Sequence, residues 1–122
     1  LDRISLGNNR LTGTIPESLY NLYNIESLYL YNNMLTGSLP KNINYSENMK
    51  TILLYGNNLM ATIPESLGNF PNLRTLELHS NKFSGTVPDV ICKNLSLLTS
   101  FMTDCTYLVE CSCCTSCYDT RT

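Results

Sequence analysis

Hydrophobic and polar positions alternate along the chain in a pattern that recurs every 24 residues. The copies follow the pattern Leu-x-x-Ile-x-Leu-x-x-Asn-x-Leu-x-Gly-x-Ile-Pro, in which apolar residues replace one another at the apolar places and one copy has Ala61 for the Gly. A fixed period of this length is typical of a solenoid, in which each repeat forms one coil and stacks on the next. We therefore expect four coils, numbered 1 to 4, at residues 1–24, 25–48, 49–72 and 73–96.

The repeat continues in a degraded form after residue 96. A fifth copy, counted at the same period, begins at Leu97 and places Ser100, Met102 and Cys105 where the earlier copies have Ile, Leu and Asn. Solenoids need covered ends, because a terminal coil otherwise exposes apolar side chains to water. Residues 97–122 therefore predict a degraded fifth repeat and a C-terminal cap.

The first half of each copy predicts a short strand with one buried face. Leu28 and Leu30 in coil 2 alternate with polar or aromatic neighbours, which is the period of a strand. An Asn follows each strand, and its side-chain amide has the donors and acceptors to bond the backbone where the strand turns and the same amide in the next coil. We expect this structural ladder at Asn9, Asn33, Asn57 and Asn81.

The second half of each copy predicts a bend and a short turn. Gly13, Gly37 and Gly85 mark the bend, where positive φ or close backbone approach favours glycine. Because coil 3 has Ala61 instead, we expect the bend to need a small side chain more than positive φ. A proline then closes each segment, and the Leu spacing in residues 17–22 is typical of a helical or 3-10 turn.

These residues resemble the leucine-rich repeat family, in its plant-specific form with Gly-x-Ile-Pro in each copy. The resemblance implies an α/β solenoid, a right-handed coil with a parallel β-sheet on its concave face and short 3-10, helical or irregular turns on its convex face. It also implies a second, short strand near the Leu-Thr-Gly-Thr segment of the coil. The tail is similar to the Cys-rich ends of secreted or membrane-anchored leucine-rich repeat proteins of diatoms and related algae.

Cysteines are confined to the end of the chain, and their even number indicates a disulfide-rich cap made in an oxidising compartment. The adjacent Cys113 and Cys114 should each bond elsewhere, and the pairing among 15 alternatives stays open. A zinc or soft-metal cluster is the alternative for the thiols of residues 111–117. The disulfide candidates are Cys92, Cys105, Cys111, Cys113, Cys114 and Cys117.

Two glycosylation sequons, at Asn44 and Asn94, agree with an extracellular or cell-surface location. The chain is 43% hydrophobic and 15% charged, which predicts a folded domain, and its net charge of -2 argues against nucleic acid as a partner. Its apolar runs are far shorter than the ~20 residues that cross a bilayer, so we expect no membrane insertion by this segment. The chain opens on no secretion signal, which we expect to have been removed or to lie outside it.

Groups with catalytic potential are sparse. His79 is the single histidine, and Glu77 lies on the same strand face, so the two resemble an acid/base pair. No nucleophile motif, phosphate loop or paired carboxylate accompanies them, and a lone imidazole lacks further metal ligands. We therefore expect no enzyme, no metal and no cofactor.

The concave face is the candidate ligand-binding surface. At the fifth place of successive coils come Ser5, Tyr29, Leu53, Glu77 and Phe101, and at the seventh come Gly7, Tyr31, Tyr55, His79 and Thr103. Aromatic side chains in this position suit a protein, peptide or glycan ligand, but they also stabilise neighbouring strands by stacking. Both interpretations stay open for Tyr29, Tyr31, Leu53, Tyr55, Glu77 and His79.

Two further rows on the same face carry less information. The second place holds Asp2, Glu26, Lys50 and Arg74, and exposed ion pairs such as Glu26 with Lys50 contribute only ~0–1 kcal/mol, so we interpret this row as a solvated face. Threonine rows occur on ice-binding solenoids, but the row formed by Thr51, Thr75 and Thr99 is short and interrupted. It gives ice binding little support.

We interpret the chain as an extracellular ligand-binding or protein-interaction module, part of a larger receptor-like or adhesion protein. The alternative is a structural cell-surface or fibre-forming repeat protein that self-assembles through its coil ends. The uneven aromatic strip favours binding, because a purely structural array tends to repeat one residue in every coil. Coil 1 lacks a cap, so an upstream coil or a second molecule should cover Leu1, Ile4, Leu6, Leu11 and Ile15.

Overall fold

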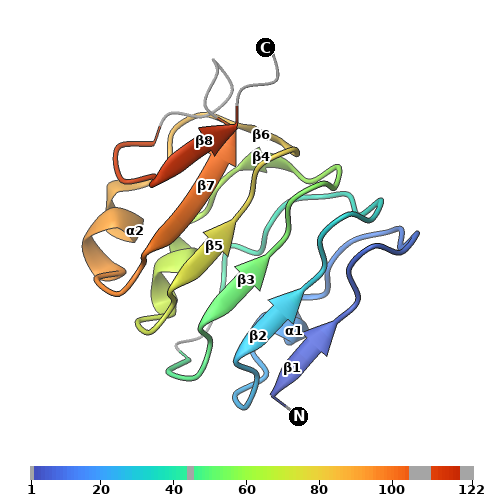
Figure 1. The fold of residues 1–122 in the computed structure, drawn as a ribbon, viewed down its shortest axis with the longest axis horizontal. Coiled ribbons are helices and arrows are strands. Elements are labelled where there is room, and N and C mark those ends of the chain that lie inside the picture. The colour runs from blue at the N-terminus through green and yellow to red at the C-terminus, as the bar shows by residue number, and fades with distance from the viewer. Residues whose placement is uncertain (1, 44–45, 105–110, 119–122) are drawn as a thin grey trace.

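The computed structural model describes residues 2–43, 46–104 and 111–118 as a stack of coils (Figure 1). Its main sheet is parallel, has six strands and follows chain order from one end of the stack to the other. The first four of these strands pair residues 24 apart, so the predicted solenoid is confirmed. The strands are β1 (Arg3–Ser5), β2 (Ser27–Tyr29), β3 (Thr51–Leu53), β5 (Thr75–Glu77), β7 (Ser100–Asp104) and β8 (Ser116–Tyr118).

A smaller parallel sheet lies where each coil bends away from the main sheet. It consists of β4 (Met60–Thr62) and β6 (Lys82–Ser84), and an isolated bridge joins Thr14 to Thr36 at the corresponding place in coils 1 and 2. These segments are the second strands that the resemblance implies.

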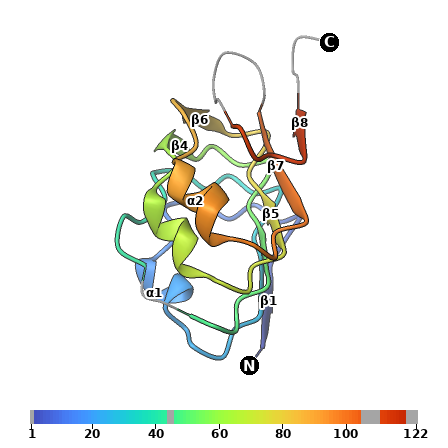
Figure 2. The ribbon, with the colours of Figure 1, turned by 90° about the vertical axis from the view of Figure 1, so that its left-hand side faces the viewer.

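The convex side carries short helices that begin directly after the repeated prolines. They are α1 (Glu17–Tyr20), the 3-10 helix η1 (Glu65–Asn69) and α2 (Asp89–Asn94). Figure 2 shows them on the opposite side of the molecule from the main sheet. Proline suits this place because it lacks the N–H that the first turn of a helix leaves unpaired.

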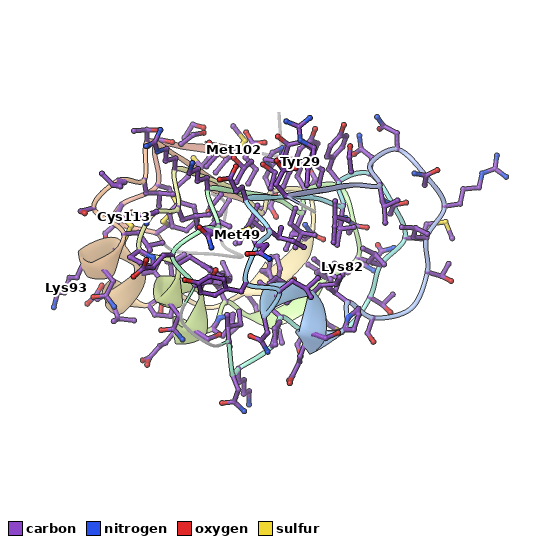
Figure 3. All side chains as sticks on the ribbon, turned by 90° about the horizontal axis from the view of Figure 1, so that it is seen from below. Tyr29, Met49, Lys82, Lys93, Met102 and Cys113 are labelled. Carbon is purple, nitrogen blue, oxygen red and sulfur yellow. A yellow bond between two sulfur atoms is a disulfide. The ribbon has the colours of Figure 1, made fainter. Side chains whose placement is uncertain are left out.

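The core fills the space between the sheet and the helices. In β2, β3 and β5 a buried side chain lies between two partly exposed ones, so that Leu28, Ile52 and Leu76 stack in a fully buried column. Figure 3 shows Met49 within this layer, whereas Tyr29 and Met102 point away from the helices on the outer face of the sheet. The pattern of the sequence therefore sets which face is the core.

The side-chain amides of the Asn ladder bond backbone groups rather than one another. The Nδ2 of Asn57 donates to the carbonyl of Leu54 in its own coil and to that of Leu30 in the coil before, and its Oδ1 accepts the N–H of Leu35. Asn33 and Asn81 make the same bonds one coil away. The predicted amide-to-amide contact between these residues was wrong, because the backbone of the preceding coil satisfies each amide first.

The bend requires positive φ, contrary to the inference from Ala61. Gly13, Gly37 and Gly85 have φ between 80° and 85°, and Ala61 adopts 69° at the same place. Coils 1 to 4 thus use the left-handed region there, and coil 3 does so with a residue that disfavours it. A second left-handed position, which was not predicted from the sequence, follows β1, β2, β3 and β5 at Asn8, Asn32, Gly56 and Ser80.

The fifth coil is one residue out of step with the predicted count. β5 pairs with β7 at Thr75 to Ser100, a separation of 25 residues, and the N–H of Leu98 bonds the carbonyl of Leu95 as that of Leu73 bonds Phe70. The extra residue therefore lies between Pro88 and Leu95, in α2. Phe101 and Thr103 were predicted to point outward, but they are buried, and Met102 and Asp104 take those places.

The cap consists of β8 and a disulfide network. Cys92 bonds Cys113, Cys111 bonds Cys114, and Cys117 is also disulfide-bonded. Figure 3 places Cys113 beside α2, and the first disulfide thereby ties the last full coil to the cap. Leu1, Asn44 and Cys105 lie outside the described residues, so the expectations for them stay predictions.

Among the described residues, no cluster of three or more His, Cys, Asp or Glu side chains is arranged to hold a metal ion. In the same part of the chain no helix is long and apolar enough to cross a membrane.

Candidate ligand-binding face

Three side chains at the seventh place form a stack across the middle of the concave face, which we call the aromatic stack: Tyr31, Tyr55 and His79. The rings of Tyr31 and Tyr55 have centroids 5.0 Å apart and planes 9° apart. Tyr55 and His79 follow with 4.8 Å and 7°. The spacing equals that of neighbouring strands, because each ring is carried by the same place of successive coils. The predicted strip is therefore one ordered element.

Gly7 closes the stack at its coil 1 end. A Cβ atom on Gly7 would lie 2.5 Å from Cζ of Tyr31, so the ring occupies the space that any side chain there would need. Tyr31 is thus covered on one face by Gly7 and on the other by Tyr55. The sequence showed Gly7 in this row but not its purpose.

Tyr29 and Arg3 extend the site toward coil 1. The ring of Tyr29 is tilted by 53° against that of Tyr31, with centroids 6.4 Å apart. The guanidinium carbon of Arg3 lies 5.6 Å from the centroid of Tyr29, within the range of a cation–π contact. Arg3 was not among the candidate residues, and it brings a positive charge to the edge of the strip.

Leu53 and Glu77 lie at the fifth place in coils 3 and 4, in register with Tyr29 on β2. The shift in coil 5 continues this row with Met102 rather than Phe101. All of these side chains are partly exposed, as are the rings of the aromatic stack. The structure therefore brings all six candidate residues of the concave face to one surface.

Burial and charge act in opposite directions on His79. Burial lowers the pKa of its imidazole below the usual 6.5, and the negative charges of Glu77 and Asp104 oppose this shift by raising it. Burial also raises the pKa of Tyr55, with smaller contributions from Tyr31 and Glu77. Burial therefore favours the uncharged forms of both the Tyr55 phenol and the His79 imidazole.

Asp104 occupies the seventh place in coil 5, at the end of the site next to His79. Its carboxylate is buried, and its Oδ1 accepts the N–H of Ser80 at 2.8 Å, while Oδ2 accepts that of Asn81 at 3.4 Å. It thus holds the left-handed turn that follows β5 and His79. This role of Asp104 was not predicted, because the 24-residue period of the sequence places Thr103 at this position.

The row of charges at the second place forms one surface ion pair. Lys50 Nζ lies 3.5 Å from Glu26 Oε1, and both side chains are almost half exposed. Such a pair contributes little to stability. It does separate a negative end of the row, at Asp2, from a positive end, at Arg74.

A hollow of about 650 Å³ lies away from this face, between the small sheet and the convex turns. It is lined by hydroxyl and aliphatic side chains with Lys41 and Glu65, and it contains no aromatic residue. We therefore locate the candidate site on the concave face, where the aromatic and titratable groups gather.

The model of the leucine-rich repeat matches residues 1–22, 24–45, 48–70 and 72–94, which is most of the chain. This chain belongs to the leucine-rich repeat family. No curated protein matches it. The resemblance inferred from the repeat is thus confirmed.

Solved structures of plant leucine-rich repeat proteins superpose closely. The plant peptide hormone receptor RGFR1 in complex with RGF2 has a TM-score of 0.78 at 32% identity, over 92% of this chain and 17% of the receptor. The ectodomain of GASSHO1/SCHENGEN3 from Arabidopsis thaliana, in complex with CASPARIAN STRIP INTEGRITY FACTOR 2, has 0.79 at 34%, over 85% and 13%. A plant ice-binding protein has 0.71 at 26%, over 91% and 35%. The chain therefore spans less than a fifth of the length of either receptor.

Proposed function

We propose that this chain is part of an extracellular receptor-like or adhesion protein and binds a protein or peptide ligand through its concave face. The observation that carries the proposal is the aromatic stack, which occupies the seventh place in coils 2, 3 and 4 only. Solenoid architecture does not require them, because coils 1 and 5 have Gly7 and Asp104 at the same place. We propose binding rather than catalysis because the described part of the chain presents an aromatic surface and the sequence has no nucleophile motif beside His79.

The exposed parts of the stack favour a hydrogen-bonding ligand over a sugar ring. Tyr31 and Tyr55 are covered on both faces, so a pyranose ring has no free aromatic face to stack on there. Both residues remain partly exposed, and neither hydroxyl bonds another described residue. Peptide backbone and polar side chains suit such a surface.

Relatives support the same assignment. Two receptors that superpose on this chain at more than 30% identity were solved in complexes: the plant peptide hormone receptor RGFR1 with RGF2, and the leucine-rich repeat ectodomain of GASSHO1/SCHENGEN3 with CASPARIAN STRIP INTEGRITY FACTOR 2. The disulfides of the cap agree with an extracellular location. The sequon at Asn94 agrees too, because this residue ends α2 and is exposed.

A selection experiment tests the proposal. The chain is immobilised and challenged with a random linear peptide library displayed on phage, and in parallel with a glycan array. We expect peptide enrichment that the soluble chain competes away and no glycan signal. Enrichment of glycans alone, or no competed peptide, would contradict the assignment of the ligand class.

Ice binding is a second candidate, because the structure reveals a hydroxyl array that the sequence count missed. The twelfth and fourteenth places lie in or next to the small sheet and its bridge. They are exposed in coils 1 to 4 and carry hydroxyl groups except at Met60: Thr12, Thr14, Thr36, Ser38, Thr62, Ser84 and Thr86. The superposition of a plant ice-binding protein on this chain favours this second candidate. Inhibition of ice recrystallisation that Thr62→Tyr abolishes would support it, and ordinary ice growth would exclude it.

A further inference from the structure

Glu77 brings a negative charge into an otherwise uncharged row of the concave face. The fifth place holds Tyr29, Leu53, Glu77 and Met102 in coils 2 to 5, and the pairing of the strands puts these residues side by side. Leu53 and Met102 are therefore the direct neighbours of Glu77 in the row, one on each side. All three are partly exposed, and Figure 3 shows Met102 on the outer face of the sheet. The row thus presents a carboxylate between two apolar side chains.

The carboxylate of Glu77 lacks a counter-charge. Among the described residues the one salt bridge joins Lys50 to Glu26, and Arg74, which precedes β5, forms none with Glu77. His79 lies two residues further along the chain, but burial favours its uncharged form. A partly exposed carboxylate without an ion-pair partner favours a ligand group of opposite charge.

The carboxylate also lies beside the aromatic stack. Burial is the largest influence on the pKa of both rings, raising that of Tyr55 and lowering that of His79, and the charge of Glu77 raises both. Glu77 is therefore close enough to act on the two rings. Because Tyr31 and His79 cover the two faces of the Tyr55 ring, a cation has no free face of Tyr55 to lie on. On this part of the surface the carboxylate is the group that holds a cation.

We propose that Glu77 selects a peptide or protein ligand that presents a basic side chain, lysine or arginine; this inference rests on the proposed function. The methylene groups of such a side chain lie against Leu53 and Met102, and its charged end pairs with the carboxylate. Both residue types combine an apolar stem with a cationic end, which matches the order of groups in the row. An acidic residue at the same place of the ligand is repelled, so the contact acts on specificity as well as affinity.

The test is the phage selection with random linear peptides, run in parallel on wild type and three variants. Peptides that wild type enriches should carry Lys or Arg more often than the input library does. Glu77→Gln should abolish this preference, and Glu77→Lys should reverse it toward Asp or Glu. Glu65→Gln is the matched control, because Glu65 is exposed on η1, on the convex side, and its replacement changes the net charge by the same amount.

Calorimetry with the peptide that wild type enriches most then measures the ion pair. Glu77→Gln should weaken binding roughly three- to tenfold at low salt, and Glu65→Gln should not. Replacing the basic residue of the peptide by Gln should cause a similar loss. The two losses should not add, because both remove the same interaction. High salt should reduce the difference between wild type and Glu77→Gln. Circular dichroism verifies that each variant is folded, which we expect because the replaced side chains are partly or fully exposed.

The imidazole of His79 reports where the basic residue binds. Its Hε1 resonance should shift when wild type binds the peptide, and should shift less when the peptide has Gln in place of its basic residue. Competed peptides without a preference for Lys or Arg, or equal affinity of wild type and Glu77→Gln, would overturn the inference and leave the proposed function standing. A selection that yields no competed peptide would overturn both.

Discussion

The ring of Tyr31 covers Gly7 so closely that a methyl group on residue 7 would lie 2.5 Å from the ring. We therefore predict that Gly7→Ala displaces Tyr31 and loosens its contact with Tyr55. Nuclear Overhauser contacts between the two rings should weaken. Gly13→Ala is the control, because Gly13 has open space around its Cα, and it should leave the ring contacts intact. Unchanged ring contacts in Gly7→Ala would show that the stack does not rest on this glycine.

Ala61 is the one alanine in a column of glycines that all have positive φ. Ala61→Gly should raise the free energy of unfolding by about 0.5–1 kcal/mol, because relief of the left-handed strain outweighs the greater entropy of glycine in the unfolded chain. Gly13→Ala should lower it by a similar amount. Urea denaturation measures both. If Ala61→Gly lowered the free energy of unfolding and Gly13→Ala left it unchanged, the bend would not require positive φ.

His79 should make stability depend on pH. Because burial lowers its pKa below 6.5, the unfolded chain binds a proton more readily than the folded chain in the window between the two pKa values. The free energy of unfolding should therefore decrease as the pH falls through that window, and His79→Phe should remove this part of the slope. Since His79 is the single histidine, its Hε1 resonance reports its pKa directly. A measured pKa above 6.5 would reverse the sign and refute the argument.

Asp104 is buried and accepts two backbone N–H groups of the turn after β5. Asp104→Ala should lower the free energy of unfolding by about 1–3 kcal/mol, because it leaves buried donors unpaired. Asp104→Asn should lower it less, because one acceptor oxygen remains. Asp104→Asn should also lower the pKa of His79 further, since it removes a negative charge that raises it. If wild type and Asp104→Ala were equally stable, water would bond the N–H groups of the turn as well as the carboxylate does.

Much of this architecture follows from the repeat itself. The alternation of apolar and polar residues around Leu28 and Leu76 predicts which strand face is buried. The 24-residue period predicts that Tyr31, Tyr55 and His79 lie in one row. These features are local or periodic, so a single sequence reveals them. The stacking of the rings, rather than a splayed arrangement, depends on the space above Gly7, which is a property of packing.

Other features could not be predicted from the sequence, for identifiable reasons. The shift in coil 5 arises because α2 has one more residue than the corresponding segments of earlier coils. Because Leu97 and Leu98 suit the first place of the repeat equally well, the sequence does not show this shift. The positive φ of Ala61 was missed because alanine signals smallness rather than a backbone conformation. Arg3 and Asp104 reach the site through contacts between coils, which no pattern within one repeat records.

The central claim is that the concave face binds its ligand through the aromatic stack. Calorimetry with a peptide enriched in the phage selection tests it most directly, by comparing wild type with the double variant Tyr31→Ala/Tyr55→Ala and with Thr62→Ala, a control on β4. We predict at least about a tenfold loss of affinity in the double variant, with a melting temperature within a few degrees of wild type, and no loss in the control. A double variant that unfolds early yet binds normally when folded would show that the stack serves structure alone and would contradict the account.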